Sequence, residues 1–151
     1  MSSIAFSAYA PSLAGSARSS KWGFAKVGLA TILAAVLANV LVYFVGDAVV
    51  GYDPDFIVLS NVSGAIIFTL AAAVVAVPIY GALLRFTANP VRIFKVISAI
   101  VFVVTTVPDF TYIPGVEGAS NGQTAVLVLM HVVAATVIIG MLTRLAVPRN
   151  C

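Results

Sequence analysis

The stretch KVGLATILAAVLANVLVYFVGD, residues 26–47, contains 20 consecutive residues without a charge between Lys26 and Asp47. At about 1.5 Å per residue, a helix of this length crosses a hydrocarbon core of about 30 Å. Three more apolar stretches follow along the chain. We therefore expect membrane spans at about 27–46, 57–84, 90–107 and 122–143. The 151-residue chain is 62% hydrophobic and 9% charged, which excludes a soluble globular domain.

Charged residues alternate between the two sides of these four stretches. The eight basic residues lie before the first stretch, between the second and third, and after the fourth: Arg18, Lys21, Lys26, Arg85, Arg92, Lys95, Arg144 and Arg149. The five acidic residues lie in the other two gaps: Asp47, Asp53, Asp55, Asp109 and Glu117. Because short cytoplasmic loops carry the excess of Lys and Arg, this pattern predicts a multi-pass protein of the cytoplasmic membrane with both termini cytoplasmic.

Short connections between the spans favour an all-α membrane protein with an antiparallel, up-and-down bundle of four helices, in which the first and last spans are neighbours. Residues 1–26 then form a cytoplasmic segment, residues 27–145 the transmembrane domain and residues 146–151 a cytoplasmic tail. The basic residues are scattered at helix ends, which favours lipid headgroups as partners and argues against nucleic acid. The single Cys151 excludes an internal disulfide.

Several residues mark helix ends or breaks. Pro78 lies inside the second span, where it removes one backbone donor and gives a cause for a kink. Asn89 and Pro90 predict the start of the third helix, with a capping side chain followed by a residue that lacks an amide hydrogen. Ser120 and Gln123 have the spacing of a capping box at the start of the fourth. The stretch from 108 to 122, rich in proline and glycine, is typical of an ordered interfacial loop rather than a helix.

Asn39 and His131 are the strongly polar residues near the middle of the spans. Each lies 13 positions from a basic residue, Lys26 and Arg144 respectively, so both are expected at similar depth and on neighbouring helices. They form a candidate polar pair, either structural or ligand-binding. His131 has three interpretations: a ligand for haem or a chlorophyll-type pigment, a proton relay, or a neutral imidazole bonded to Asn39 or a backbone carbonyl. With one histidine in the chain, a two-histidine haem site within one subunit is impossible.

Motifs for catalysis and metal binding are absent from the sequence. There is no HExxH, GxSxG or CxxC pattern, no glycine loop for phosphate, and no second histidine. Asp53 and Asp55, together with Asp109 or Glu117, are candidates for a divalent cation, but the segregation of charge across the membrane explains them without a site. We therefore predict that the protein is not an enzyme and has no metal site.

Three segments resemble a family of uncharacterised bacterial membrane proteins with four spans, known as a domain of unknown function. They are ANVLVYFVG at 38–46, NPVRIFKV at 89–96 and LVLMHVVAATVIIGMLTRLA at 127–146. The resemblance covers the four spans. It implies a four-helix fold in a bacterial cytoplasmic (inner) membrane, and it implies no substrate or cofactor.

These observations favour a non-enzymatic accessory subunit whose helix bundle packs against other membrane proteins or against copies of itself. One alternative is a carrier or binding protein for a small apolar or lipid-like ligand, with a cavity near Asn39, His131 and Pro78. A second alternative is a subunit that binds haem or a pigment through His131.

Overall fold

The computed structural model describes residues 13–146 and contains four long α-helices in that part of the chain. They are α1 (Leu13–Val50), α2 (Val62–Phe86), α3 (Pro90–Thr111) and α4 (Asn121–Leu145), with a short 3-10 helix, η1 (Ile113–Gly115), after α3. Each long helix contains a segment that is long and apolar enough to cross a membrane. The described residues contain no strand. The predicted all-α fold with four spans is therefore confirmed.

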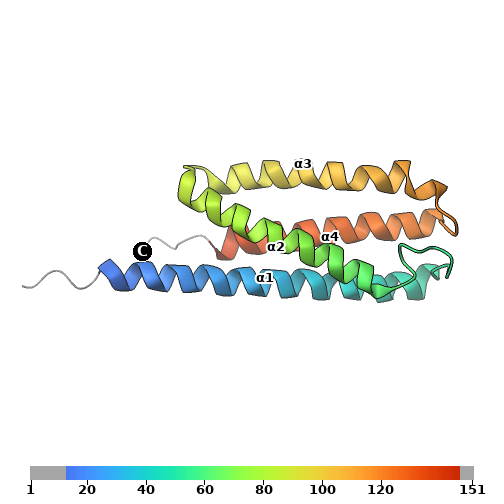
Figure 1. Ribbon diagram of the computed structural model, residues 1–151, viewed down its shortest axis with the longest axis horizontal. Helices are drawn as coiled ribbons and strands as arrows, with labels where there is room; N and C mark the ends of the chain where they lie inside the picture. The colour runs from blue at the N-terminus through green and yellow to red at the C-terminus, as the bar shows by residue number, and fades with distance from the viewer. Residues whose placement is uncertain (1–12, 147–151) are drawn as a thin grey trace, which may run out of the picture.

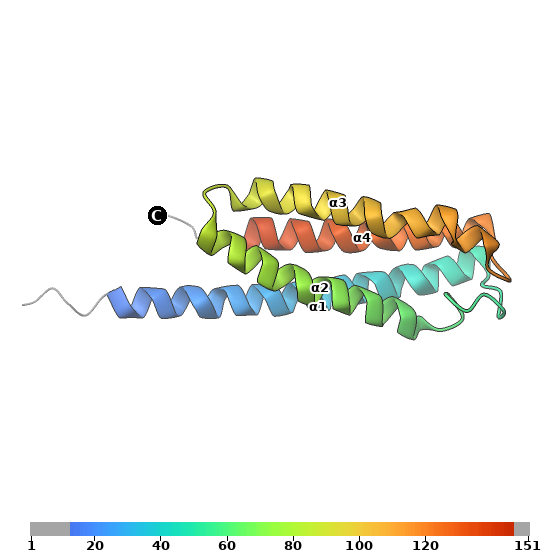
Figure 2. The same cartoon turned by 45° about the horizontal axis from the view of Figure 1, so that its top comes forward.

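Consecutive helices run in opposite directions, as an up-and-down bundle requires (Figure 1). The first and last helices, α1 and α4, share the most extensive contact, which confirms that they are neighbours. Helix α2 packs mainly on α1, and α3 packs mainly on α4. Figures 1 and 2 show α2 inclined across the bundle, close to α3 near their connection and farther from it towards the opposite end.

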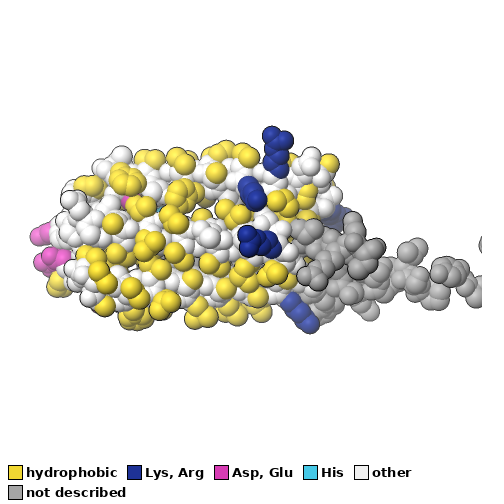
Figure 3. Space-filling model, turned by 180° about the vertical axis from the view of Figure 1, so that it is seen from behind, with side chains coloured by type: hydrophobic (Ala, Val, Ile, Leu, Met, Phe, Trp, Pro, Cys, Tyr) yellow, Lys and Arg dark blue, Asp and Glu magenta, His cyan; other side chains and the backbone are white. Residues whose placement is uncertain are grey.

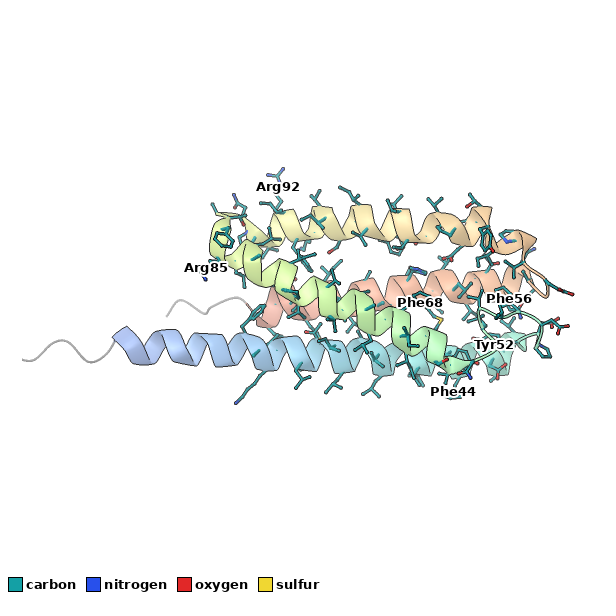
Figure 4. All side chains as sticks on the ribbon, viewed as in Figure 1. Phe44, Tyr52, Phe56, Phe68, Arg85 and Arg92 are labelled. Carbon is teal, nitrogen blue, oxygen red and sulfur yellow. The ribbon has the colours of Figure 1, made fainter. Side chains whose placement is uncertain are left out.

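The two ends of the bundle carry opposite charges. Basic side chains lie at one end, here called the basic end, and acidic side chains protrude at the other, here called the acidic end (Figure 3). The basic end includes Arg85 and Arg92 beside the connection between α2 and α3, whereas Tyr52 and Phe56 lie in a loop at the acidic end (Figure 4). Apolar side chains cover the surface between the two ends, as contact with lipid requires.

The helices begin and end at residues that differ in part from the expected spans. Helix α1 starts at Leu13, so residues 13–26 are helical, and this part extends beyond the bundle at the basic end (Figure 1). No proline between Leu13 and Lys26 interrupts it. Residues 57–61 precede α2 instead of opening it, because the Asn61 side chain accepts a hydrogen bond from the Ser63 amide and caps the helix at Val62. Residues 1–12 and 147–151, including Cys151, lie outside the described part of the chain.

The predicted helix starts at Pro90 and after Ser120 are confirmed. The Ser120 hydroxyl accepts from the Gln123 amide at 3.2 Å, and the Gln123 side chain accepts from the Ser120 amide at 2.9 Å. Helix α3 begins at Pro90, but the Asn89 side chain makes no capping hydrogen bond. Helix α2 continues through Pro78 as one α-helix.

The prediction of a loop from residue 108 was wrong at its start. Helix α3 continues through Pro108 to Thr111, and Asp109 lies on it as a buried residue. A proline removes one backbone hydrogen bond, and this cost is offset when the residues beyond it pack against the bundle. Here the carboxyl group of Asp109 faces α4 and reaches His131. Asp109 is therefore part of the helix bundle, although the sequence pattern placed it with the acidic residues of the loops.

The buried residues form two apolar clusters. The cluster near the acidic end comprises Tyr43, Phe56, Leu59, Ile113, Val126, Leu127 and Met130. The cluster near the basic end comprises Ala35, Ala73, Tyr80, Phe94, Ile138 and Leu142. On α1, Asn39 lies one turn from Ala35 and one turn from Tyr43, so a polar residue separates the two clusters.

Candidate functional site

Asn39 is buried between α1 and α2 and bonds across that interface. Its Nδ2 donates to Oγ1 of Thr69 at 2.7 Å, and 3% of Asn39 is exposed. Its Oδ1 is buried without a hydrogen-bond partner among the described residues. Interhelical hydrogen bonds of this kind within membranes contribute about 0.6 kcal/mol on average and up to about 1.7 kcal/mol. The Asn39–Thr69 bond therefore fixes the register of α2 on α1 more than it stabilises the fold.

His131 and Asp109 form the second polar contact between helices, at the interface of α4 and α3. Nδ1 of His131 lies 3.3 Å from Oδ2 of Asp109 and 2.9 Å from the backbone carbonyl of Leu127, one turn earlier on α4. Asp109 is almost fully buried, whereas a third of the His131 side chain is exposed. Both contacts use the same ring nitrogen, Nδ1, and neither uses Nε2.

The contact between His131 and Asp109 is a close approach of two polar groups rather than an aligned hydrogen bond. The ring nitrogen is aligned with the Leu127 carbonyl, and Oδ2 of Asp109 has no aligned donor although it lies 3.3 Å away. A buried carboxylate without a full set of hydrogen bonds is costly unless a positive charge stands beside it or it carries a proton. The buried Asp109 carboxyl group therefore depends on the imidazole of His131 beside it.

The expected polar pair of Asn39 and His131 has a different arrangement in the structure. Asn39 bonds to Thr69, which the sequence did not single out. His131 bonds to a backbone carbonyl, that of Leu127, which was one of its predicted partners, and it also lies beside Asp109, which was not predicted. Counting residues from the basic end gives depth along a helix, but it gives no information about which way a side chain faces. Thr69 lies 16 positions from Arg85, close enough in depth to Asn39 for the same count to have identified it.

Two tyrosines tie the loop between α1 and α2 to the end of α1. The hydroxyl of Tyr43 donates to the carbonyl of Leu59 at 2.9 Å, and the hydroxyl of Tyr52 donates to the carbonyl of Tyr43 at 2.8 Å. The Tyr52 amide also donates to a carboxylate oxygen of Asp47. Phe56, in the same loop, is fully buried in the apolar cluster. The loop is thus an ordered cap on the acidic end, as Figure 4 shows for Tyr52 and Phe56.

Tyr52 gives this cap a dependence on alkaline pH. Burial, and then the charge of Asp47 and the proximity of Tyr43, raise the pKa of Tyr52 from 10.0 to about 12. Because the folded protein favours the neutral phenol, this contribution to stability is complete below pH 10 and is lost as the pH rises through 12. We expect a tyrosinate absorbance step near pH 12 that Tyr52→Phe removes. A titration curve that the substitution leaves unchanged in this range contradicts the assignment.

The acidic side chains do not gather into a metal site. No group of three or more His, Cys, Asp or Glu side chains in the described part of the chain is placed to hold a metal ion. Asp53 instead accepts a hydrogen bond from the Asp55 amide within its own loop.

An open depression of about 450 Å³ lies between α1 and α4, towards the basic end. Its lining residues are Ala34, Thr136, Val137, Gly140, Met141, Arg144 and Leu145. The sequence predicted a cavity near Asn39, His131 and Pro78, but none of these three residues lines this depression. The depression is a surface feature of the helix pair α1 and α4 and not an internal chamber.

Comparison with known protein families identifies the family of the chain. The family model described as a family of unknown function, DUF6069, matches residues 19–147. The chain belongs to this family. The match extends from the helical part before the first span to just past the end of α4, so all four spans of this DUF6069 protein lie inside it. No curated protein and no solved structure matches the sequence.

Proposed function

We propose that this DUF6069 protein is a non-enzymatic, multi-pass protein of a bacterial cytoplasmic membrane that acts by packing against another membrane protein or a second copy of itself. The excess of Lys and Arg at the basic end supports a cytoplasmic location for that end and for both termini. The resemblance to bacterial proteins with four spans supports the choice of membrane.

The observation that carries the proposal is the outward face of α2. Ala71, Val75, Pro78 and Ala82 follow one another at intervals of three or four residues, so they lie along one stripe of the helix, and all four are exposed. The stripe has a small alanine at each end, Ala71 and Ala82, and no long side chain between them, so a second helix can approach it within lipid. We call this stripe the α2 face.

Pro78 also leaves a backbone carbonyl on α2 without its usual hydrogen-bond donor. It has no amide hydrogen to donate to the carbonyl of Val74, and Val74 and Pro78 are both exposed. The Val74 carbonyl therefore lacks its usual helical donor, and a helix packed on the α2 face is placed to supply one.

The use of the other polar side chains supports a role without catalysis. The Asn39–Thr69 bond and the Asp109–His131 pair each join two helices of the bundle. Hydroxyls on the spans bond to carbonyls of their own helix, as Thr105 does with Val101. The two pairs join helices and the hydroxyls bond within single helices, so these polar groups already have structural partners.

The association is tested by measuring the mass of the protein in nanodiscs after purification from its native membrane. We expect an oligomer or a co-purifying membrane protein, and we expect Ala71→Phe on the α2 face to disrupt it. Ala99→Phe, at an exposed position of α3, is the matched control and should leave the association intact. A monomer without a partner, or equal effects of both substitutions, contradicts the proposal.

A second candidate function is ligation of haem or a pigment by His131. Its support is the placement of the Asp109 carboxylate and the Leu127 carbonyl at Nδ1, the arrangement that orients a ligating histidine and leaves Nε2 as the ligand atom. An absorption spectrum of the purified protein tests it.

A further inference from the structure

The depression between α1 and α4 has the chemistry of an amphiphile site. Ala34 and Gly140 leave space in it because their side chains are small or absent, and a Cβ atom added at Gly140 would meet nothing within 4 Å. Val137, Met141 and Leu145 supply apolar walls. Arg144, in the last turn of α4, lines the same depression at the basic end.

We propose that this depression binds one anionic phospholipid, with its phosphate on Arg144 and one acyl chain along Ala34 and Gly140. The guanidinium group presents several donors in a plane that suits phosphate oxygens. No acidic residue lines the depression to oppose an anionic headgroup. The site lies on α1 and α4, whereas the α2 face lies on α2, so the site is independent of the proposed association.

The length of the depression favours a lipid over a partner helix. From Thr136 to Leu145 it spans ten residues, or about 14 Å along α4. One leaflet of the hydrocarbon core is about 15 Å deep. The depression therefore matches one acyl chain in the leaflet at the basic end, whereas a helix that crosses the membrane would need a groove through both leaflets.

The test counts the lipids that stay bound to the full-length protein. The protein is released from nanodiscs of phosphatidylcholine with a minor fraction of phosphatidylglycerol, and native mass spectrometry gives the number of each lipid retained. We expect one phosphatidylglycerol molecule on the wild type. Arg144→Gln removes the headgroup contact, and Gly140→Leu places a side chain in the depression at a position where a Cβ atom would meet nothing within 4 Å. Each should lower the retention by about tenfold or more.

Arg92→Gln is the matched control, because Arg92 is a basic residue at the same end that points away from the bundle (Figure 4). It should retain the lipid as the wild type does. An equal loss with Arg92→Gln means that the attraction is due to the overall charge of the basic end and overturns the proposal. Retention that falls with Arg144→Gln but not with Gly140→Leu also overturns it, since the acyl chain then lies elsewhere. Gly140→Leu changes no charge, so it decides the question even if Arg144→Gln does not fold.

Discussion

Replacing His131 by leucine is expected to lower the free energy of unfolding by about 3 kcal/mol, because it leaves Asp109 buried without its partner. The loss of one member of a buried pair is more costly than the loss of both, since the remaining group keeps its full desolvation cost. The unfolding of the purified protein in detergent, followed by helix content against denaturant or temperature, measures the effect.

The double variant Asp109→Leu with His131→Leu separates this mechanism from a loss of packing. Two apolar side chains need no counter-charge, so the double variant is expected within about 1 kcal/mol of the wild type. The coupling between the two positions is then about 2 kcal/mol or more in a double-mutant cycle. Thr105→Val is the matched control, because the Thr105 hydroxyl is exposed and bonds only to its own helix.

The same variants test whether His131 is a ligand. If protein purified from its native membrane has a visible absorption band that His131→Leu removes, the second candidate function is correct. If no band is present and the double variant restores stability, the pair joins α3 to α4 and has no bound group. An effect of His131→Leu no larger than that of Thr105→Val shows that the pair does not stabilise the bundle.

The sequence was sufficient to predict the number of helices and the contact between α1 and α4. Both follow from length and charge, because 20 apolar residues between Lys26 and Asp47 leave few alternatives to a span. The capping box at Ser120 and Gln123 was also predictable, since its two hydrogen bonds are local and depend on spacing alone.

The partners of the polar residues were not predictable in the same way. The partner of Asn39 depends on how α1 and α2 are rotated about their axes, and the sequence gives depth without rotation. Asp109 was assigned to a loop because Pro108 precedes it, although the proline costs α3 only one hydrogen bond. The burial of Asp109 against His131, residues from two helices, outweighs that local signal.

Replacing Gly118 by alanine is the second substitution expected to have a large effect, of about 3 kcal/mol. Gly118 has φ of +73°, in the left-handed region where an L residue costs about 1–2 kcal/mol. A Cβ atom there would lie 2.8 Å from the backbone nitrogen of Phe56 and 3.1 Å from the carbonyl carbon of Asp55. Backbone atoms cannot rotate away as a side chain can, so overpacking adds about 1–3 kcal/mol.

Two other glycines separate these contributions. Gly51 has φ of +69° and open space around its Cβ position, so Gly51→Ala should show the conformational cost alone, about 1 kcal/mol. Gly115 has open space and no positive φ, so Gly115→Ala should change the stability by less than about 0.5 kcal/mol. The order expected from unfolding in detergent is therefore Gly118, then Gly51, then Gly115. Equal effects at Gly118 and Gly51 would mean that the loop after η1 does not press on the loop that carries Phe56. A larger effect at Gly118 means that the two loops form one cap, which holds the buried ring of Phe56 over the acidic end of the bundle.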